Sequence, residues 1–441
     1  MRSAADCLSG ATHVVLSTPD FYGRLLGKKR RADEWQRIVA DGLGMPDFFL
    51  ICDPAGRPLS GFEVAGPHAG FRNAFLSPDP AAAFVLPTEP KVMHVICDGL
   101  APSGEAIPES PRSILKAQLA RLVERGVVGR AASELEFYVL DQAYGDVHAG
   151  EYRELRPVYH RSGDNEVIVA SVIAPFADEI ERALQASEIV VDQIQTEGGA
   201  GQLEVNVGPA DLLAAADDHV VFKHVVKACG HKLGRAVTFM AKPFEDGAGS
   251  GGHIHLSLAG ESGENLLGEA EELSPFGRGF VAGILSHLPE LTLMLAPYAN
   301  SFKRLVPGSY APLAATWGWD NRTAMVRLIA GRGGPRLELR SPGADINPYH
   351  AYAALIAAGL AGVDAGLELA AEKRGDVEPR DALPLPADLT EATARFAGSV
   401  FAVEAFGAAC HAHILHHARQ ELGATRRAVT EWEIERGFEN A

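Results

Sequence analysis

Four short segments of this chain alternate polar and apolar residues with period two. They are residues 133–137 (SELEF), 202–206 (QLEVN), 253–257 (HIHLS) and 336–340 (RLELR). This period predicts strands with one buried apolar face. The opposite faces carry mainly carboxylates and imidazoles, which are ligands for hard and borderline cations. The pattern therefore predicts strands that bring metal-ligand side chains to a cavity or to solvent.

The acidic residues on these predicted strands repel one another if they converge. Carboxylates at i and i+2 lie about 7 Å apart, because a strand rises about 3.3 Å per residue. In one partly dry cavity such groups must either protonate or share bound cations. Oxygen-rich clusters with one imidazole suit Mg²⁺ or Mn²⁺, often in pairs. The segments hold no thiolates, which argues against structural zinc.

Helical periodicity and turn signals place the other elements. A stretch with Gly, Pro and Ser at 98–111 separates an N-terminal part with short apolar runs from a part that mixes helices and strands. We therefore place a domain boundary near residue 105. The predicted strands of the first part are 48–52, 83–86 and 92–97. The predicted helices are 111–125, 178–190, 211–230, 275–290, 348–372 and the tail 389–439, with a loop at 374–388.

Size, charge and cysteine usage narrow the function classes. A chain of 441 residues can hold one large or two ordinary domains. Its formal charge of −17 argues against a nucleic-acid partner, whose binding surface is basic. The first ten residues show no signal region, and no apolar run approaches about 18 residues, so we expect neither secretion nor membrane insertion. The cysteines are scattered and odd in number, which predicts reduced thiols in a cytoplasmic protein: Cys7, Cys52, Cys97, Cys229 and Cys410.

Glycine-rich nucleotide motifs do not fit this chain. Residues 23–29 have one residue too few between their glycines for a phosphate-binding loop and lack its Ser or Thr, and 247–252 leads into a strand. Any bound phosphates must then be held by metals and arginines, since guanidinium forks fit phosphate oxygens. The candidate arginines are Arg304, Arg322, Arg327 and Arg340. Carboxylates for metal together with such arginines indicate phosphoryl transfer.

A histidine-rich stretch near the C-terminus allows two interpretations. His411, His413, His416 and His417 have the density of a metal-binding tract. Their neighbours include Ala, Ile and Leu in a helical context, which favours a packed or interface helix.

Taken in chain order, these segments resemble the glutamine synthetase family. Six stretches carry the resemblance over roughly residues 110–350, and their order makes it specific although each alone is weak. They are 133–137 (SELEF), 195–204 (QTEGGAGQLE), 249–255 (GSGGHIH), 300–308 (NSFKRLVPG), 320–322 (DNR) and 336–340 (RLELR). The resemblance implies an α+β fold with an N-terminal β-grasp domain over 1–104. It also implies a catalytic domain over 105–441, in which a curved antiparallel sheet forms half of a funnel surrounded by helices.

The motif positions imply a role for each candidate site residue. One divalent metal ion would be held by Glu136, Glu197 and Glu204. A second would be held by Glu134, His253 and Glu338, with two or three Mg²⁺ or Mn²⁺ ions in each site. Glutamate or the phosphoryl intermediate would lie near Gly249, Arg304 and Arg340. The catalytic residues would be Arg322, Arg327 and Tyr310. ATP, as co-substrate, would lie near Asp192, His255 and Ser257.

The resemblance also implies a two-step reaction. The glutamate γ-carboxylate attacks the ATP γ-phosphate to form an acyl phosphate, and an amine then displaces phosphate to leave a γ-glutamyl amide. The family assembles as stacked rings, so we expect a homo-oligomer, a dodecamer of two stacked hexamers with sites between subunits. Glutamate, ATP and an amine are the expected partners.

Two acids that capture ammonium in ammonia-using members are missing here. Tyr310 lies in PGSYAP (307–312) where those members carry a Glu, and 61–71 contains no Asp-Gly-Ser-Ser stretch. Ala248 also replaces an Asn before Gly-Ser-Gly. Ammonium needs anionic ligands, whereas a tyrosine face suits an alkyl or aryl group. We therefore hypothesise a glutamate–amine ligase that acts on a small alkylamine, ethanolamine or a polyamine.

Two alternatives remain open at this point. One is an ammonia-dependent glutamine synthetase in which other side chains substitute for the missing acids. The other is a non-catalytic structural or regulatory homologue, against which the intact metal and arginine sets argue. An alkylammonium ion with a pKa near about 10 must lose a proton before it attacks, and Glu63 or His68 is a candidate base.

Overall fold

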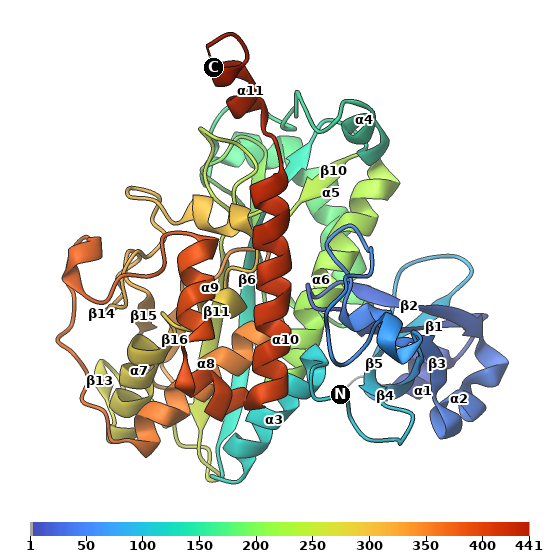
Figure 1. The fold of residues 1–441 in the computed structure, drawn as a ribbon, viewed down its shortest axis with the longest axis horizontal. Coiled ribbons are helices and arrows are strands. Elements are labelled where there is room, and N and C mark those ends of the chain that lie inside the picture. Colours follow the sequence, from blue (N-terminus) through green and yellow to red (C-terminus); the bar gives the residue numbers. More distant parts are fainter. Residues whose placement is uncertain (1–2, 441) are drawn as a thin grey trace.

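The computed structural model describes residues 3–440, which form the predicted α+β fold (Figure 1). Its N-terminal sheet has the strand order β2-β1-β5-β4-β3. The central pair β1 and β5 is parallel and the other pairs are antiparallel, as expected for a β-grasp sheet. The strands are β1 (His13–Pro19), β2 (Leu25–Arg31), β3 (Leu43–Pro46), β4 (Asn73–Val85) and β5 (Val92–Leu100), with helices α1 (Ala4–Leu8) and α2 (Trp35–Asp41) beside them.

The second sheet contains all four strands predicted from the period-two segments. Its order is β14-β15-β16-β11-β6-β8-β7, and β9 and β10 also pair with β6. Most pairs are antiparallel, as expected, and β14 and β15 form a parallel pair at one edge of the sheet. The strands are β6 (Val128–Leu140), β7 (Val191–Thr196), β8 (Gln202–Val207), β9 (Ala210–Asp211), β10 (Ala236–Thr238), β11 (Gly252–Ala259), β14 (Trp317–Trp319), β15 (Val326–Ile329) and β16 (Arg336–Leu339). The short pair β12 (Gly268–Glu269) and β13 (Glu272–Leu273) stands apart.

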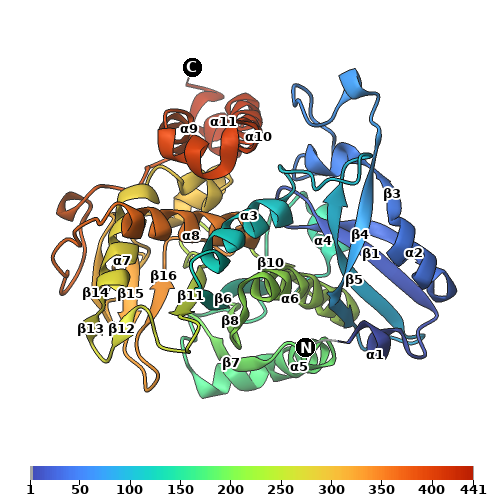
Figure 2. The same ribbon diagram turned by 90° about the horizontal axis from the view of Figure 1, so that it is seen from below.

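Helices cover the second sheet and separate it from the first. Helix α8 is apolar on all sides and almost wholly buried, and it packs against α7, α3 and α6. Figure 2 shows α6 between the large sheet and the N-terminal sheet. The helices are α3 (Pro111–Val123), α4 (Tyr144–Ala149), α5 (Val167–Ala186), α6 (Leu212–Leu233), α7 (Pro275–His287), α8 (Pro348–Asp364), α9 (Leu389–Ala397), α10 (Val400–Arg427) and α11 (Glu431–Gly437).

The histidine-rich stretch lies on α10 and packs against the N-terminal part. The His417 ring stacks on Phe21 with centroids 3.6 Å apart, and its Nε2 donates to the carbonyl oxygen of Leu50 at 3.0 Å. The ring of His416 lies edge-on to Phe62, with centroids 4.3 Å apart. The packed-helix interpretation therefore describes this stretch.

Three sequence-based assignments are corrected by the structure. The helix predicted over 348–372 ends at Asp364, where Gly366 follows in the left-handed region. Residues 48–52 were predicted as a strand, but Asp47–Leu50 form a 3-10 helix. A short apolar run shows neither a helical nor a strand period, so its backbone is ambiguous. The ring of Pro46 fixes its own φ angle just before the 3-10 helix begins. Helix α5 begins at Val167 rather than near 178, because it accommodates Pro175 in its interior instead of starting after it.

The boundary between the two domains stays a proposal. One apolar cluster lies within the N-terminal sheet and reaches Ile107, beyond the predicted end at 104. A second cluster covers the large sheet and also includes Phe21, Phe84 and Ile96 of the N-terminal part. Among residues 3–440, no single helix is long and apolar enough to cross a membrane. The bent pair Leu389–Ala397 and Val400–Gly437 reaches that length and composition only when its two parts are counted together.

Candidate active site

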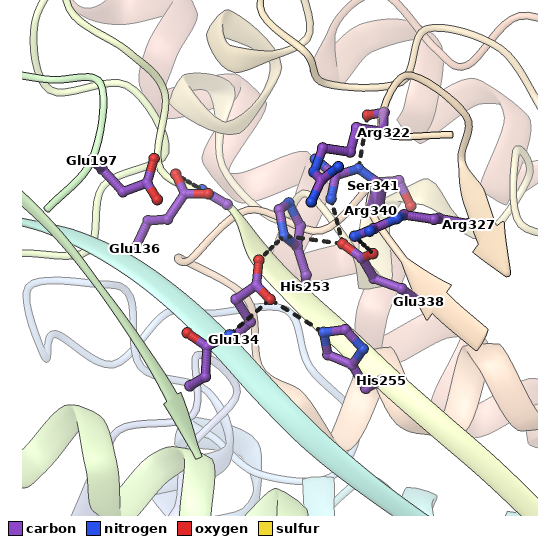
Figure 3. Close-up of polar contacts among 12 residues, drawn as sticks. Glu134, Glu136, Glu197, His253, His255, Arg322, Arg327, Glu338, Arg340 and Ser341 are labelled. Carbon is purple, nitrogen blue, oxygen red and sulfur yellow. Dashed lines mark hydrogen bonds and ion pairs between the residues drawn. The ribbon is translucent and has the colours of Figure 1, made fainter. Parts of the chain in front are cut away.

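The order of four adjacent strands gathers the acidic side chains. Strands β16, β11, β6 and β8 are neighbours, and their register sets His253 opposite Glu134 and His255 opposite Glu338. On the other side of β6, Glu136 pairs with Glu204. Side chains at alternate positions share one face of a sheet. Figure 3 shows Glu134, Glu136, His253, His255 and Glu338 close together on that face.

Glu134 is the centre of the first cluster. Its Oε1 lies 2.7 Å from His253 Nδ1, and its Oε2 lies 3.2 Å from His255 Nε2. Asn206 Nδ2 donates to the same Oε2 at 3.0 Å. Although burial opposes it, these histidine contacts hold the pKa of the Glu134 carboxyl well below its usual range. Glu134 is therefore an anionic ligand group at neutral pH.

Glu338 joins this cluster to the arginines. Its side chain is fully buried and forms ion pairs with Arg327, at 2.9 Å, and with Arg340. Its Oε1 also lies 3.5 Å from His253 Nδ1. Burial raises its pKa, but His253 and Arg340 outweigh that effect and lower it below the ordinary value. Ligand atoms of Glu134, His255 and Glu338 all lie within 4.8 Å of one another, a spacing that one metal ion can bridge.

The second cluster contains the other carboxylates, Glu136, Glu197 and Glu204. Glu136 Oε2 accepts hydrogen bonds from the Gly251 amide at 2.8 Å and from Gln202 Nε2 at 3.1 Å. Burial raises the pKa of Glu136 to about 7, and burial with the nearby Glu134 charge raises that of Glu204 to about 10. Burial raises the pKa of Glu197 too. A bound cation would offset the repulsion among these carboxyls and favour their anionic forms.

The donor set of both clusters fits divalent cations. Hard oxygen ligands predominate, and a carboxylate pair with an imidazole is a common Mg²⁺ or Mn²⁺ set. Two buried polar atoms near Glu134, Asn206 Oδ1 and His255 Nδ1, have no hydrogen-bond partner among residues 3–440. Orphaned acceptors and crowded carboxylates are what a bound cation would satisfy.

The structure brings both imidazoles to the same acids, so the separate roles expected for His253 and His255 stay predictions. The sequence assigned His253 to the metal and His255 to the nucleotide. Both imidazoles contact Glu134; His253 Nδ1 also lies near Glu338, and His255 forms a compact group with the same two acids. The other ring nitrogen of His253, Nε2, lies 3.3 Å from the Arg304 guanidinium, so its ring connects the acidic cluster to that arginine.

Arg304 is buried and held against the strand ends. Its guanidinium donates to the carbonyl oxygens of Ser341 and Arg340, both at 3.2 Å. It packs so closely on Gly249 that a Cβ there would lie 2.6 Å from Arg304 Cγ. The absence of a side chain at Gly249 therefore lets Arg304 occupy this position. Any contact between Gly249 and a substrate would be a separate role.

Several predicted residues lie apart from the two clusters. Tyr310 is 73 % exposed on the 307–312 flap, and its φ of 56° lies in the left-handed region. Arg322 is exposed, and its carbonyl oxygen accepts a hydrogen bond from Arg340 Nε at 2.8 Å. Asp192 is exposed on the edge strand β7, and Ser257 follows His255 along β11. No interaction joins Asp192, Ser257 or Tyr310 to the carboxylates among the described residues, so their roles stay predictions.

Sequence reasoning missed two amides that orient the carboxylates. Asn206 holds Glu134, and Gln202 Nε2 bonds both Glu136 and the Gly249 carbonyl oxygen at 3.0 Å. Both lie on the polar face of the predicted strand 202–206, on either side of Glu204. Their period-two position was the available signal.

Comparison with known proteins identifies relatives along the whole chain. Residues 108–437 match the profile described as glutamine synthetase, catalytic domain. A gamma-glutamylethanolamide synthetase of Streptomyces coelicolor is 35% identical over 427 residues, which cover 97% of this chain and 92% of the relative. A glutamate–isopropylamine ligase of a Pseudomonas species is 31% identical over 431 residues, with coverage of 96% and 94%. A solved complex of GmaS with ADP is 28% identical, with a TM-score of 0.86 and full coverage of both chains.

Proposed function

We propose that this chain, which belongs to the glutamine synthetase family, joins the γ-carboxylate of glutamate to a primary amine larger than ammonia. Membership makes it an ATP-dependent carbon–nitrogen ligase. The observation that carries the proposal is the convergence of two carboxylate clusters with Arg304, Arg327 and Arg340 on one face of the sheet. Acidic metal ligands beside guanidinium groups are the equipment for phosphoryl transfer.

The proposed reaction balances in two steps. A γ-carboxylate oxygen of glutamate bonds to the γ-phosphorus of ATP, and the bond to the bridging oxygen breaks to release ADP. The amine nitrogen then bonds to the acyl carbon, phosphate leaves with the electrons of the broken C–O bond, and the nitrogen loses a proton. Arg327 and Arg322 stabilise charge on the transferred group, while Arg304 and Arg340 orient glutamate.

Bound divalent ions, in two or three copies of Mg²⁺ or Mn²⁺, would neutralise the polyphosphate charge. Glu136, Glu197 and Glu204 would hold one of them. Glu134 and Glu338 would hold another together with one histidine. That histidine would be His253 or His255, since a ligand atom of His255 also lies within 4.8 Å of those of both acids. Asp192 and Ser257 are proposed neighbours of the nucleotide.

The choice of a larger amine rests on the flap and on the relatives. Tyr310 presents a mostly exposed aromatic side chain at the position where an ammonium-binding Glu is expected. An aromatic face binds alkyl groups and does not neutralise a small cation as a carboxylate does. The name of one relative specifies an amide of ethanolamine and that of the other specifies isopropylamine, and both amines are larger than ammonia.

A substrate panel tests this proposal. Phosphate release measured with glutamate, ATP and each of ammonia, methylamine, ethanolamine, isopropylamine, putrescine and spermine is expected to give the highest kcat/KM for an organic amine. Ammonia exceeding every amine by a wide margin would indicate a glutamine synthetase instead. No metal-dependent ADP release with any of them would indicate a non-catalytic homologue.

Substitution of the flap residue is expected to shift this preference. In Tyr310→Glu, the new carboxylate should raise kcat/KM for ammonia relative to the preferred amine by about tenfold, since one charge contact is worth about 1–2 kcal/mol. Tyr310→Phe serves as control and should retain the wild-type preference. If the ratio of kcat/KM for ammonia to that for the preferred amine were unchanged in Tyr310→Glu, Tyr310 would not determine the choice of amine.

A methyl group at Gly249 is expected to weaken glutamate binding. Gly249→Ala would push Arg304 away from its carbonyl partners, because the new Cβ meets backbone and side-chain atoms at 2.6–3.1 Å. We expect the KM for glutamate to rise about tenfold with a smaller change in the KM for ATP. Gly333→Ala, where a Cβ meets nothing within 4 Å, is the control. Equal effects on both KM values would argue against this role.

The homo-oligomer with two stacked hexamers also remains a proposal. Ring assembly would bring the N-terminal part of one subunit to the site of its neighbour. Mass photometry of the purified protein is expected to show one species near twelve times 46.9 kDa. A monomer with full ligase activity would contradict shared sites.

A further inference from the structure

A cavity of about 730 Å³ lies between the N-terminal sheet and α6. Its walls are the turn between β1 and β2, one face of α6, and β10 with the residues that follow it. None of the predicted metal, glutamate or nucleotide residues lines it. A pocket of this size accommodates a small metabolite.

One face of α6 supplies a row of basic side chains to this cavity. Lys223, His224, Lys227 and His231 recur at helical spacing, so they share a face about 12 Å long. Lys227 is exposed at the cavity, and its Nζ lies 5.8 Å from the ring centroid of Phe239. Within residues 3–440, Lys227 makes no hydrogen bond and no ion pair. Its ammonium group is therefore available to an external acceptor.

Aromatic side chains provide further free donors. The rings of Tyr22 and Tyr298 stack with centroids 5.1 Å apart and an interplanar angle of 17°. Neither hydroxyl has a hydrogen-bond partner among the described residues, although both tyrosines line the cavity. His231 stacks on Tyr144 at 4.3 Å, and its ring nitrogens also have no hydrogen-bond partner in this part of the chain. Buried phenols normally find an acceptor.

The acids at one end of the cavity do not cancel the basic groups. Burial raises the pKa of both Asp345 and Glu421, and neither carboxyl forms an ion pair with Lys223 or Lys227 among the described residues. Lys223 Nζ donates to the carbonyl oxygens of Ala344 and Ile346 at 2.8 and 3.3 Å rather than to a carboxylate. Burial and the neighbouring Lys227 lower the pKa of Lys223 to about 7. An anion in the cavity would stabilise the charged form of both lysines.

We propose that this cavity is a second binding site, for a small anion whose carboxylate or phosphate oxygens accept hydrogen bonds from Lys227, His231 and the paired tyrosines. Such oxygens match the unpaired donors, and the aromatic walls cover the carbon skeleton of the ligand. The site is independent of which amine the ligase uses.

The cavity touches the segment that carries Arg304. Asn300 lines the cavity and lies with Arg304 on the 3-10 helix Ala299–Arg304. Its side chain bonds the backbone of Lys242 through both amide atoms, at 2.9 Å each. An anion bound here would contact one end of a short rigid element whose other end lies in the active site.

Titration calorimetry of the full chain in EDTA tests the site. Glutarate serves as the dicarboxylate probe, and AMP and inorganic phosphate serve as phosphate probes. We expect at least one probe to bind wild-type protein, and the one that binds identifies the source of the oxygens. Lys227→Gln should weaken that binding about tenfold or more. Lys232→Gln is the matched control, because Lys232 is exposed on the same helix and pairs with Glu179 at 2.8 Å.

Two results would overturn the proposal. Either none of the three probes binds, or the bound probe has the same Kd in Lys227→Gln as in wild type, which would place it at the glutamate or nucleotide site. Lys227→Gln assayed with glutamate, ATP and the amine but without added glutarate, AMP or phosphate should keep wild-type ligase kcat, so loss of the second site is distinguishable from failure of the proposed function. Tyr298→Phe provides a second variant. It removes only a hydroxyl and should weaken binding of the same probe.

Discussion

Glu338→Gln is expected to reduce kcat/KM for the ligase reaction about a hundredfold or more. The carboxylate is fully buried between His253, Arg327 and Arg340, and the amide keeps its shape but not its charge. The two arginines would then lose their anionic partner and the first cluster would lose a metal ligand. Loss of one such ligand or one preorganised charge costs about this factor. Coupled-enzyme measurement of ADP release against metal concentration gives the value.

A matched control separates the charge from the substitution itself. Glu271→Gln alters an exposed glutamate outside both clusters and should leave kcat/KM within about twofold. Circular dichroism should show the same fold in both variants. If Glu338→Gln retained activity and metal dependence within threefold of wild type, the first cluster would not take part in the reaction.

Arg112→Ala is expected to lower the free energy of unfolding by about 3–5 kcal/mol. Arg112 lies on α3 with its side chain fully buried, and it donates to both carboxylate oxygens of Asp217 at 3.0 and 2.8 Å. It also pairs with Asp79 and Asp98 of the N-terminal sheet, at 2.9 and 2.6 Å. Removing it leaves Asp217 buried without its counter-ion, which is the costly outcome for a buried ion pair. Urea denaturation followed by fluorescence measures the change.

Lys116→Ala provides the comparison for this stability prediction. Lys116 lies four residues further along α3 and pairs with Asp98, but its side chain is 39% exposed. An exposed pair contributes about 1 kcal/mol or less. We therefore expect the two substitutions to differ by at least about 2 kcal/mol. Equal effects would show that the Arg112 network does not join the N-terminal sheet to α6.

The strands of the site could be predicted because their signal is local. Alternation of Glu or His with Leu, Val or Ile along 133–137, 202–206, 253–257 and 336–340 requires only neighbouring residues to be compared, and all four segments are strands. Helices with a clear apolar face, such as 211–230, were found for the same reason. Residues 48–52 were misassigned because a short run of apolar residues is compatible with several backbones.

The pairing of individual side chains could not be predicted from the sequence. Whether His253 or His255 lies nearest both acids depends on the register of β11 against β6 and β16, which tertiary packing sets. The orienting amide of Asn206 depends on the register of β8 in the same way. The basic cavity beside α6 needs the N-terminal sheet as its second wall, so no local pattern reveals it.

We propose that carboxylates from separate strands jointly hold divalent cations beneath the phosphates of ATP. Diffraction from crystals grown with Mn²⁺ and ADP, recorded for anomalous scattering, tests it most directly. We expect one manganese peak bounded by Glu134 and Glu338 and a second bounded by Glu136, Glu197 and Glu204. An ordered ADP with no manganese at either cluster, or with manganese bound elsewhere, would contradict it.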